Sequence, residues 1–240
     1  MKKKILSVAL AVAILAIVVS GSLAYFTSED EVTNTFTVGS VQIEIWENGA
    51  LVEGETLTMP DMLIPVVGTN PEVTTDNYGQ KQVTVKNTGK NDAYVQVFVA
   101  VPKVLDDAGV LEFMKNYPDS ESYNWVGGDT VVGTMTDDDG IVCNIYKFAY
   151  SKLLEDGATT DSEAIEYVYL TSATDLNVVS DAQGNVTAAY LVDANGTELS
   201  GVNVKDGIPV YVYAQAIQAE GFSDYNHALT SGFGDTNPWQ

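Results

Sequence analysis

Hydrophobic and polar residues alternate with a period of two along much of this chain. In residues 40–46 (SVQIEIW) and 80–87 (QKQVTVKN), apolar side chains occupy every second position, which predicts strands with one buried face. Residues 93–101 (AYVQVFVAV) are apolar on nearly both faces, which predicts a central strand that ends at Pro102. Residues 208–219 (IPVYVYAQAIQA) predict a second strand of this kind.

The middle of the chain is less regular. Residues 105–117 (LDDAGVLEFMKNY) predict a short helix, and residues 124–133 (NWVGGDTVVG) predict a loop with strand fragments. Residues 140–150 (GIVCNIYKFAY) and 164–170 (AIEYVYL) predict two more strands. We therefore interpret residues 103–170 as an insertion, partly helical and partly irregular, at the rim of the fold.

Turn signals separate the apolar runs near the C-terminal end. Asn195 and Gly196 lie between two such runs and predict a hairpin turn, and residues 221–235 predict a closing loop with at most one helical turn. Many short strands with little helix favour an all-β fold. We expect residues 37–240 to form a single antiparallel β-sandwich of jelly-roll or immunoglobulin-like type.

The N-terminal segment has the anatomy of an export signal. Three lysines precede the apolar residues 5–19, and the small residues Ser22 and Ala24 follow. This order predicts a signal helix over residues 1–24 that is cleaved before Tyr25, so we expect a secreted protein that meets the membrane only transiently. The alternative is an uncleaved anchor, because the aromatic pair after Ala24 lengthens the apolar stretch.

The charge of the chain limits its partners. The formal net charge is -22, all cationic side chains are lysines, and removal of the three lysines in the signal segment takes the net charge to -25. Such a surface repels phosphates, so no nucleic-acid binding is expected. It keeps an exported protein soluble and attracts cations or basic partners.

Candidate catalytic residues are sparse. Cys143, the single cysteine, lies in an apolar run, where a buried and inert thiol is expected. His227 is the single histidine, so the two-histidine zinc motif of common metalloproteases is absent from the sequence. A pairing of Cys143 with His227 is conceivable, but neither neighbourhood has the form of a nucleophile turn. We therefore predict a protein without enzymatic activity or a bound cofactor.

One acidic turn is a minor candidate for calcium. Asp137, Asp138 and Asp139 precede Gly140, and carboxylate oxygens are the ligands that calcium prefers. The spacing does not fit an EF-hand loop, so a solvated acidic turn is the default interpretation and weak calcium binding is the alternative.

The segment GSLAYFTSEDEVTNTFTVGSVQIEIWE, residues 21–47, resembles the N-terminus of the TasA/camelysin family of secreted proteins of Gram-positive bacteria. Residues 83–102 and 213–222 resemble two further blocks of that family, whereas residues 103–205 match none. The N-terminal resemblance rests on a small residue and alanine before the cut, an aromatic pair after it, and the first strand. These positions are Ser22, Ala24, Tyr25, Phe26, Phe36, Gly39, Val41 and Ile43.

The resemblance implies a jelly-roll sandwich that polymerises into extracellular biofilm fibres. Its implied partners are copies of itself, a SipW-type signal peptidase and related matrix proteins. Camelysin-like members have been classed as metallopeptidases, so a secreted metallopeptidase stays open as an alternative. A surface adhesin or carbohydrate-binding module is the third class, since many tyrosines lie in the predicted strands.

The position of the cut suggests how assembly would begin. Cleavage after Ala24 would free residues 25–36 as a flexible arm, and an extended arm can complete the edge of a neighbour's sheet. Its candidate anchors in the neighbour are Tyr25, Phe26, Val32 and Phe36. The alternative is that the arm simply frays, as chain termini often do.

Overall fold

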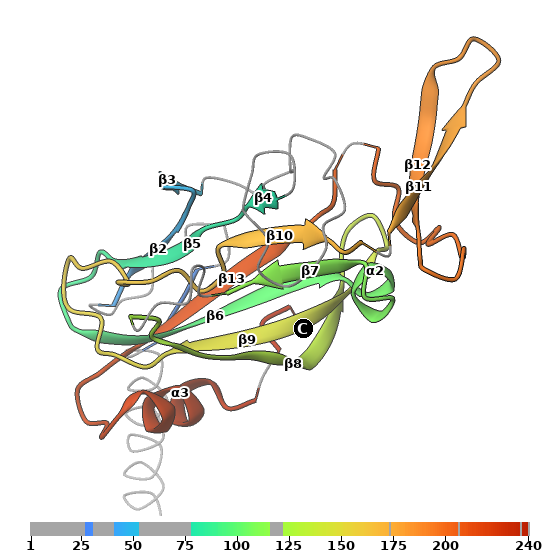
Figure 1. Ribbon diagram of the computed structural model, residues 1–240. Coiled ribbons are helices and arrows are strands. Elements are labelled where there is room, and N and C mark those ends of the chain that lie inside the picture. Colours follow the sequence, from blue (N-terminus) through green and yellow to red (C-terminus); the bar gives the residue numbers. More distant parts are fainter. Residues whose placement is uncertain are drawn as a thin grey trace, which may run out of the picture.

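A computed structural model describes residues 27–30, 41–52, 78–115, 122–172, 174–205, 207–235 and 237–239. These residues form an all-β sandwich of antiparallel sheets, as predicted (Figure 1). The N-terminal signal helix predicted for residues 1–24 lies outside the described residues. Within the described part, no helix has the length and apolar character needed to cross a membrane.

The first layer is a five-stranded sheet in the order β1, β13, β6, β9, β8. The central strand is β6, which is buried on both faces except at Tyr94 and ends at Pro102, as the sequence predicts. Its neighbours pair with it along most of its length, β13 over eight residues and β9 over seven. The strands are β1 (Thr27–Asp30), β13 (Tyr211–Gln218), β6 (Ala93–Pro102), β9 (Val142–Tyr150) and β8 (Trp125–Thr136).

The second layer contains two three-stranded sheets. In the first, β2 lies between β3 and β5, and in the second, β10 lies between β4 and β7. Residues 158–166 connect the two sheets, because their backbone bonds to β5 and to Lys81. The strands are β2 (Ile43–Glu47), β3 (Ala50–Leu51), β5 (Val83–Asn87), β4 (Tyr78–Gln80), β10 (Tyr167–Leu170) and β7 (Leu111–Met114).

The main hydrophobic core lies between these layers. The buried faces of β2 and β5 alternate with partly exposed positions, as the period of two predicts, and β6 contributes a continuous row of valines. Two polar pairs are also buried: Lys81 bonds Glu47 at 2.7 Å, and Gln96 bonds Gln215 at 2.6 Å. The pairing offsets part of the cost of burying these groups, although Gln96 Oε1 has no hydrogen-bond partner among the described residues.

The interpretation of residues 103–170 as a rim insertion is wrong for most of that region. Its strands β8 and β9 belong to the five-stranded sheet, and β7 and β10 belong to the second layer. Residues 124–133, predicted as a loop with strand fragments, lie largely in the twelve-residue strand β8. The pairing of β8 with β9 shifts register after Gly127 and again after Val131, and these irregularities obscure the strand pattern in the sequence.

The helix predicted over residues 105–117 is also displaced. The structure has a helix of five residues, α2 (Lys103–Asp107), followed by a turn and by the strand β7. Gly109 adopts a φ of 63° in that turn, a conformation that glycine adopts without strain and that ends a helix. The glycine therefore divides the apolar run into a helix and a strand.

The closing segment contains more helix than predicted. Within residues 221–235, α3 (Tyr225–Phe233) has nine residues, and its first backbone N–H groups are capped by Asp224, whose side chain accepts from the His227 N–H. Apolar residues of α3 cover Ile217 on the outer face of the five-stranded sheet. A Cβ atom at Gly232 would lie 2.4 Å from Ile217 Cδ1, so glycine permits this close helix–sheet contact.

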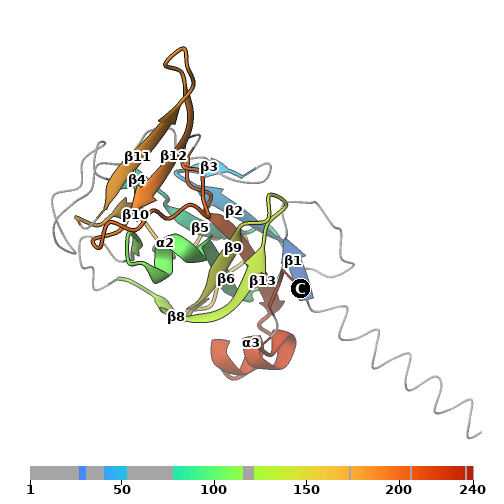
Figure 2. The ribbon, with the colours of Figure 1, turned by 90° about the vertical axis from the view of Figure 1, so that its right-hand side faces the viewer.

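A two-stranded hairpin projects from the sandwich (Figures 1 and 2). It consists of β11 (Asp175–Ser180) and β12 (Val186–Val192), joined by residues 181–185. The predicted turn at Asn195 and Gly196 is present, and the chain there returns to β12 through a single bridge between Val192 and Glu198. The longer hairpin immediately before it was missed in the sequence.

Candidate assembly interface

The N-terminal strand β1 completes an edge of its own sheet. Residues 27–30 lie beside β13 (Figure 2) and pair antiparallel with its Ala214–Ile217. In this register Ser28 lies opposite Ala216. We expected residues 27–30 to be free, as part of the flexible arm predicted for residues 25–36. The structure differs because the outer edge of β13 offers unpaired backbone groups, which a nearby extended segment of the same chain can bond.

The strand that accepts β1 is held independently of it. On its other side, β13 pairs with β6 over its full length. Ala214 and Ala216 lie in the main core, Ile217 lies under α3, and Gln215 bonds Gln96. These contacts hold the edge of β13 in place when β1 leaves, so the same edge can receive an equivalent strand from another chain.

The remaining predicted assembly residues cannot be placed on this edge. Ser22, Ala24 and Tyr25 at the predicted cleavage site lie outside the described residues. So do the arm anchors Phe26, Val32 and Phe36. Their roles in cleavage and assembly stay predictions.

The opposite edge of the same sheet is β8. Within the described residues no strand pairs with its outer side, and three of its valines, Val126, Val131 and Val132, are exposed. The Lys115 ammonium bonds the Gly127 carbonyl at 2.9 Å and contacts the Asp129 carboxylate. The Asn237 amide donates to the Thr134 carbonyl at 2.9 Å. This edge therefore carries exposed apolar side chains, and side chains rather than a strand bond two of its carbonyls.

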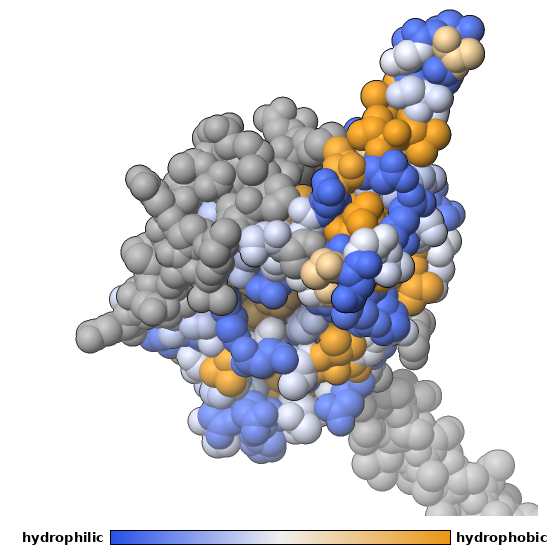
Figure 3. All heavy atoms as spheres, turned by 45° about the vertical axis from the view of Figure 1, so that its right-hand side comes forward, coloured by the Kyte–Doolittle hydropathy of each residue, from blue (hydrophilic) through white to orange (hydrophobic). Residues whose placement is uncertain are grey.

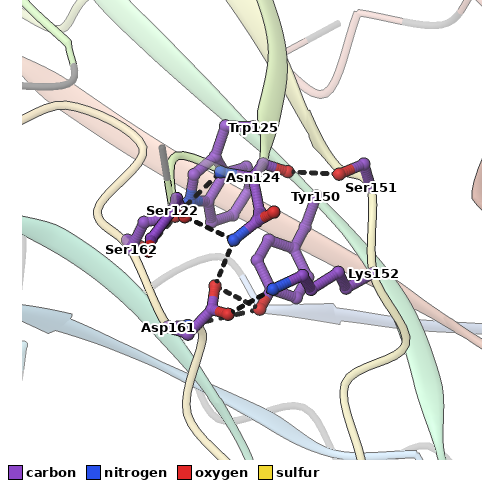
Figure 4. Close-up of polar contacts among 8 residues, drawn as sticks. All are labelled: Ser122, Asn124, Trp125, Tyr150, Ser151, Lys152, Asp161 and Ser162. Atoms are coloured by element: carbon purple, nitrogen blue, oxygen red, sulfur yellow. Dashed lines mark hydrogen bonds and ion pairs between the residues drawn. The ribbon is translucent and has the colours of Figure 1, made fainter. Parts of the chain in front are cut away.

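A polar network fixes the end of the sheet where β8 begins (Figure 4). The Asp161 carboxylate accepts hydrogen bonds from the Tyr150 hydroxyl at 2.8 Å, the Asn124 amide at 2.9 Å and the Lys152 ammonium at 2.7 Å. Burial raises the Asp161 pKa, but the bonds from Lys152, Tyr150 and Asn124 outweigh it and hold the pKa below its usual range. Nearby, the Trp125 indole donates to the Ser162 carbonyl. The network closes a loop against the sheet, and no motif in the residue order predicts it.

In the acidic turn proposed for calcium, the Asp137 carboxylate is hydrogen-bonded within the fold. Asp137 accepts from the Ile141 N–H at 2.7 Å and from the Tyr211 hydroxyl at 2.6 Å, whereas Asp138 and Asp139 lie at the surface of the turn. Among the described residues, no group of three or more His, Cys, Asp or Glu side chains is arranged to hold a metal ion. Calcium binding here stays a prediction without structural support.

The two candidate catalytic residues lie in different settings. Cys143 is fully buried, as predicted, and burial together with the nearby Asp137 raises the pKa of its thiol to about 12. His227 is exposed at the start of α3, with its ring nitrogen 3.3 Å from the Ser223 hydroxyl. No hydrogen bond of the described residues joins Cys143 to His227, and a protonated thiol at neutral pH is a poor nucleophile.

Comparisons with known proteins add little to this picture. No protein-family model matches the sequence, and no curated protein matches it. Among solved structures, the chain is similar to a type II cohesin domain from the cellulosome of Acetivibrio cellulolyticus, at 13% identity and a TM-score of 0.20. The match covers 66% of this chain and 87% of the cohesin domain, and a TM-score this low supports no argument about function.

Proposed function

We propose that this protein is a secreted structural subunit that assembles into extracellular fibres of a biofilm matrix by exchanging its N-terminal strand. The observation that supports the proposal is the pairing of β1 with the edge of β13. A strand that can leave this edge in one copy can fill it in the next. The sequence resemblance to the TasA/camelysin family points to the same class of protein.

Exchange of β1 is energetically feasible. The strand makes only four residue pairs, and each backbone hydrogen bond contributes a net stabilisation of about 0.5–1.5 kcal/mol. Equivalent backbone hydrogen bonds form when the strand pairs with β13 of the neighbour, so exchange changes the bonding energy little. The protein concentration then decides whether the strand pairs within its own copy or with another. A contact that passes a strand from each copy to the next builds a filament when the rotation between copies does not close a ring, whereas reciprocal exchange between two copies gives a dimer.

Signal cleavage would control the exchange. Before cleavage, the segment around β1 is joined to a membrane-directed helix, which restricts where the strand can reach. After cleavage before Tyr25, the strand has a free end and can enter another copy. Export and assembly would thereby be coupled in one step.

A reversible disulfide tests this proposal directly. Ser28 and Ala216 lie opposite each other in the register, at a separation that a disulfide can bridge. In the double variant Ser28→Cys/Ala216→Cys, oxidation at low protein concentration should lock β1 in its own sheet and prevent fibres. Reduction should restore fibre growth, measured by electron microscopy and light scattering.

The two single variants control for the substitutions themselves, and each should form fibres under both conditions. Fibre growth by the oxidised double variant at the rate of the reduced form would rule out strand exchange. Deletion of residues 25–34 gives a second test, because it should abolish fibres and leave a folded monomer.

A further inference from the structure

The exposed large apolar residues concentrate in two places. One group lies on or beside the edge strand β8, and the other lies on the projecting hairpin. These regions are poor in charge: residues 125–136 contain one charged residue, Asp129, and residues 176–192 contain one, Asp181, in a chain with 33 acidic residues. The first group consists of Val126, Val131, Val132 and Val142, and the second of Val178, Val179 and Val186.

The outer part of the hairpin lacks support from the core. Residues 178–187 are all exposed, and Figure 3 shows hydrophobic residues along the hairpin below a hydrophilic tip. Leu191 and Ala189 on β12 are buried in the core, and Ala189 lies opposite Val178 in the register. Val178 therefore lies on the same face of the hairpin as Ala189, which faces the core. At Val178 this apolar face has no cover among the described residues. A two-stranded hairpin is only marginally stable in water, so this part gains most from a partner.

The β8 edge has a matching recess. A cavity of about 250 Å³ opens beside Val132 and Gly133 and is lined also by Phe98, Ile145, Lys147, Asp235 and Asn237. The apolar part of its lining, Phe98, Val132 and Ile145, suits a branched aliphatic side chain. Lys115 pairs with Asp129, and Lys147 lines the cavity together with Asp235, so charges of both signs meet here and this region repels another acidic chain less than the rest of the surface does.

We infer that the hairpin of one copy docks on the β8 edge of a second copy, with Val178 and Val186 against Val131 and Val132. This inference rests on the proposed fibre function and adds a second contact to it. A second copy is the occupant that the charges favour, because these two charge-poor surfaces are where strongly acidic chains can approach each other. Apart from the Gly127 and Thr134 carbonyls, which Lys115 and Asn237 bond, the outer side of β8 carries no strand among the described residues, which lets the contact include strand pairing.

The positions of the two surfaces make the contact head-to-tail. In both ribbon views the hairpin projects from one end of the molecule, and β8 lies toward the opposite side (Figures 1 and 2). A contact between two different surfaces is head-to-tail, and it repeats along a filament when the rotation between copies does not close a ring. The hairpin contact and the exchanged strand would then connect the same line of subunits.

Cysteine cross-linking tests the contact in the secreted chain. The double variant Val131→Cys/Val186→Cys should give a ladder of disulfide-linked oligomers on a non-reducing gel during assembly. A mixture of the two single variants should give dimers that stop at two chains. The matched control is Val131→Cys/Leu153→Cys, because Leu153 is exposed to a similar degree (41%, against 43% for Val186) but lies outside both surfaces.

A ladder from the double variant with none from the control is the expected result. Dimers from Val186→Cys alone would indicate a symmetric contact and overturn the inference, as would equal ladders from the control. A second measurement uses Val178→Thr/Val186→Thr, which keeps the β-branched shape and the fold. This variant should raise the dissociation constant of self-association at least tenfold, measured by sedimentation, and an unchanged dissociation constant would overturn the inference.

The two proposals fail in different ways. Fibres without the ladder would remove the hairpin contact and leave strand exchange intact. A ladder together with fibre growth by the oxidised Ser28→Cys/Ala216→Cys variant would remove strand exchange and leave the hairpin contact. Each result therefore assigns the failure to one interface.

Discussion

At one edge of the five-stranded sheet, β13 is covered by a strand of four residues, whereas at the other edge β8 extends for twelve residues with its outer side unpaired among the described residues. The covering strand β1 pairs with β13 over four residues. The long strand β8 is irregular, with two register shifts and two glycines of positive φ, Gly127 and Gly128.

The two edges limit uncontrolled pairing with strands of other chains in different ways. A strand of the same chain can cover an edge, as β1 covers β13. Bulges can twist an open edge, as in β8, so that a flat strand pairs with it poorly. In the assembly that we propose, the covered edge is the one that exchanges its strand. The irregular edge would accept only a partner that also matches its side chains, as we infer for the hairpin.

The largest expected effect comes from the glycine that bends β8. A Cβ at Gly128 would lie 2.1 Å from a ring carbon of the buried Phe148, at a φ of 80°. Gly128→Ala should therefore lower the free energy of unfolding by about 3 kcal/mol, from backbone strain and overlap together. Denaturant unfolding measures this loss.

The matched control for that variant is Gly140→Ala. Gly140 has a φ of 82° with no atom within 4 Å of the added Cβ, so backbone strain alone should cost about 1 kcal/mol. Equal losses in the two variants would show that the contact with Phe148 does not shape β8.

A smaller effect is expected at the covered edge. Deletion of residues 25–34 should lower the stability of the monomer by about 2 kcal/mol, because four residue pairs are lost. A synthetic peptide of residues 25–36 should restore the melting temperature in a concentration-dependent way. A peptide of the same composition in scrambled order is the control, and equal rescue by both would mean that β13 does not select this strand.

The smallest effect concerns the network at the start of β8. Asp161→Asn should lower stability at neutral pH by about 1 kcal/mol, after allowance for screening at a carboxylate that is 45% exposed. The Asp161 pKa is lowered in the folded protein, so its contribution is present above the unfolded value near 4 and is lost as the pH falls through the folded value. The difference between wild type and variant should shrink below about pH 4, and a difference that is constant with pH would contradict this role.

The sequence predicted the parts of the fold whose burial pattern is simple. Strands β2, β5 and β6 correspond to the alternation in residues 40–46 and 80–87 and to the apolar run of residues 93–101. Burial on one face gives alternating residues and burial on both faces gives an apolar run, so both patterns can be read from the sequence. Strand β8 was predicted only as fragments in a loop, because its glycines and register shifts interrupt such a pattern. Helix α3 was missed because its apolar side chains are spaced to cover Ile217, a contact that only the folded sheet reveals.

The interface was predicted only in outline. The sequence located the segment that becomes β1 but not the edge of its own chain that it fills, since strand pairing depends on distant residues. The hairpin left a recognisable signal in two similar turns: Asp181 accepts from the N–H groups of Gln183 and Asn185, and Asp193 from those of Asn195 and Thr197. Only the second turn was identified, because Asn-Gly is the stronger hairpin signal.

The burial of Cys143 gives the protein a built-in reporter of its own opening. Its thiol stays protonated at neutral pH and has no access to solvent, so an external thiol reagent can label it only when the sheet around it separates. Labelling rates would then measure how often each subunit unfolds, in solution or within a fibre, without any added probe.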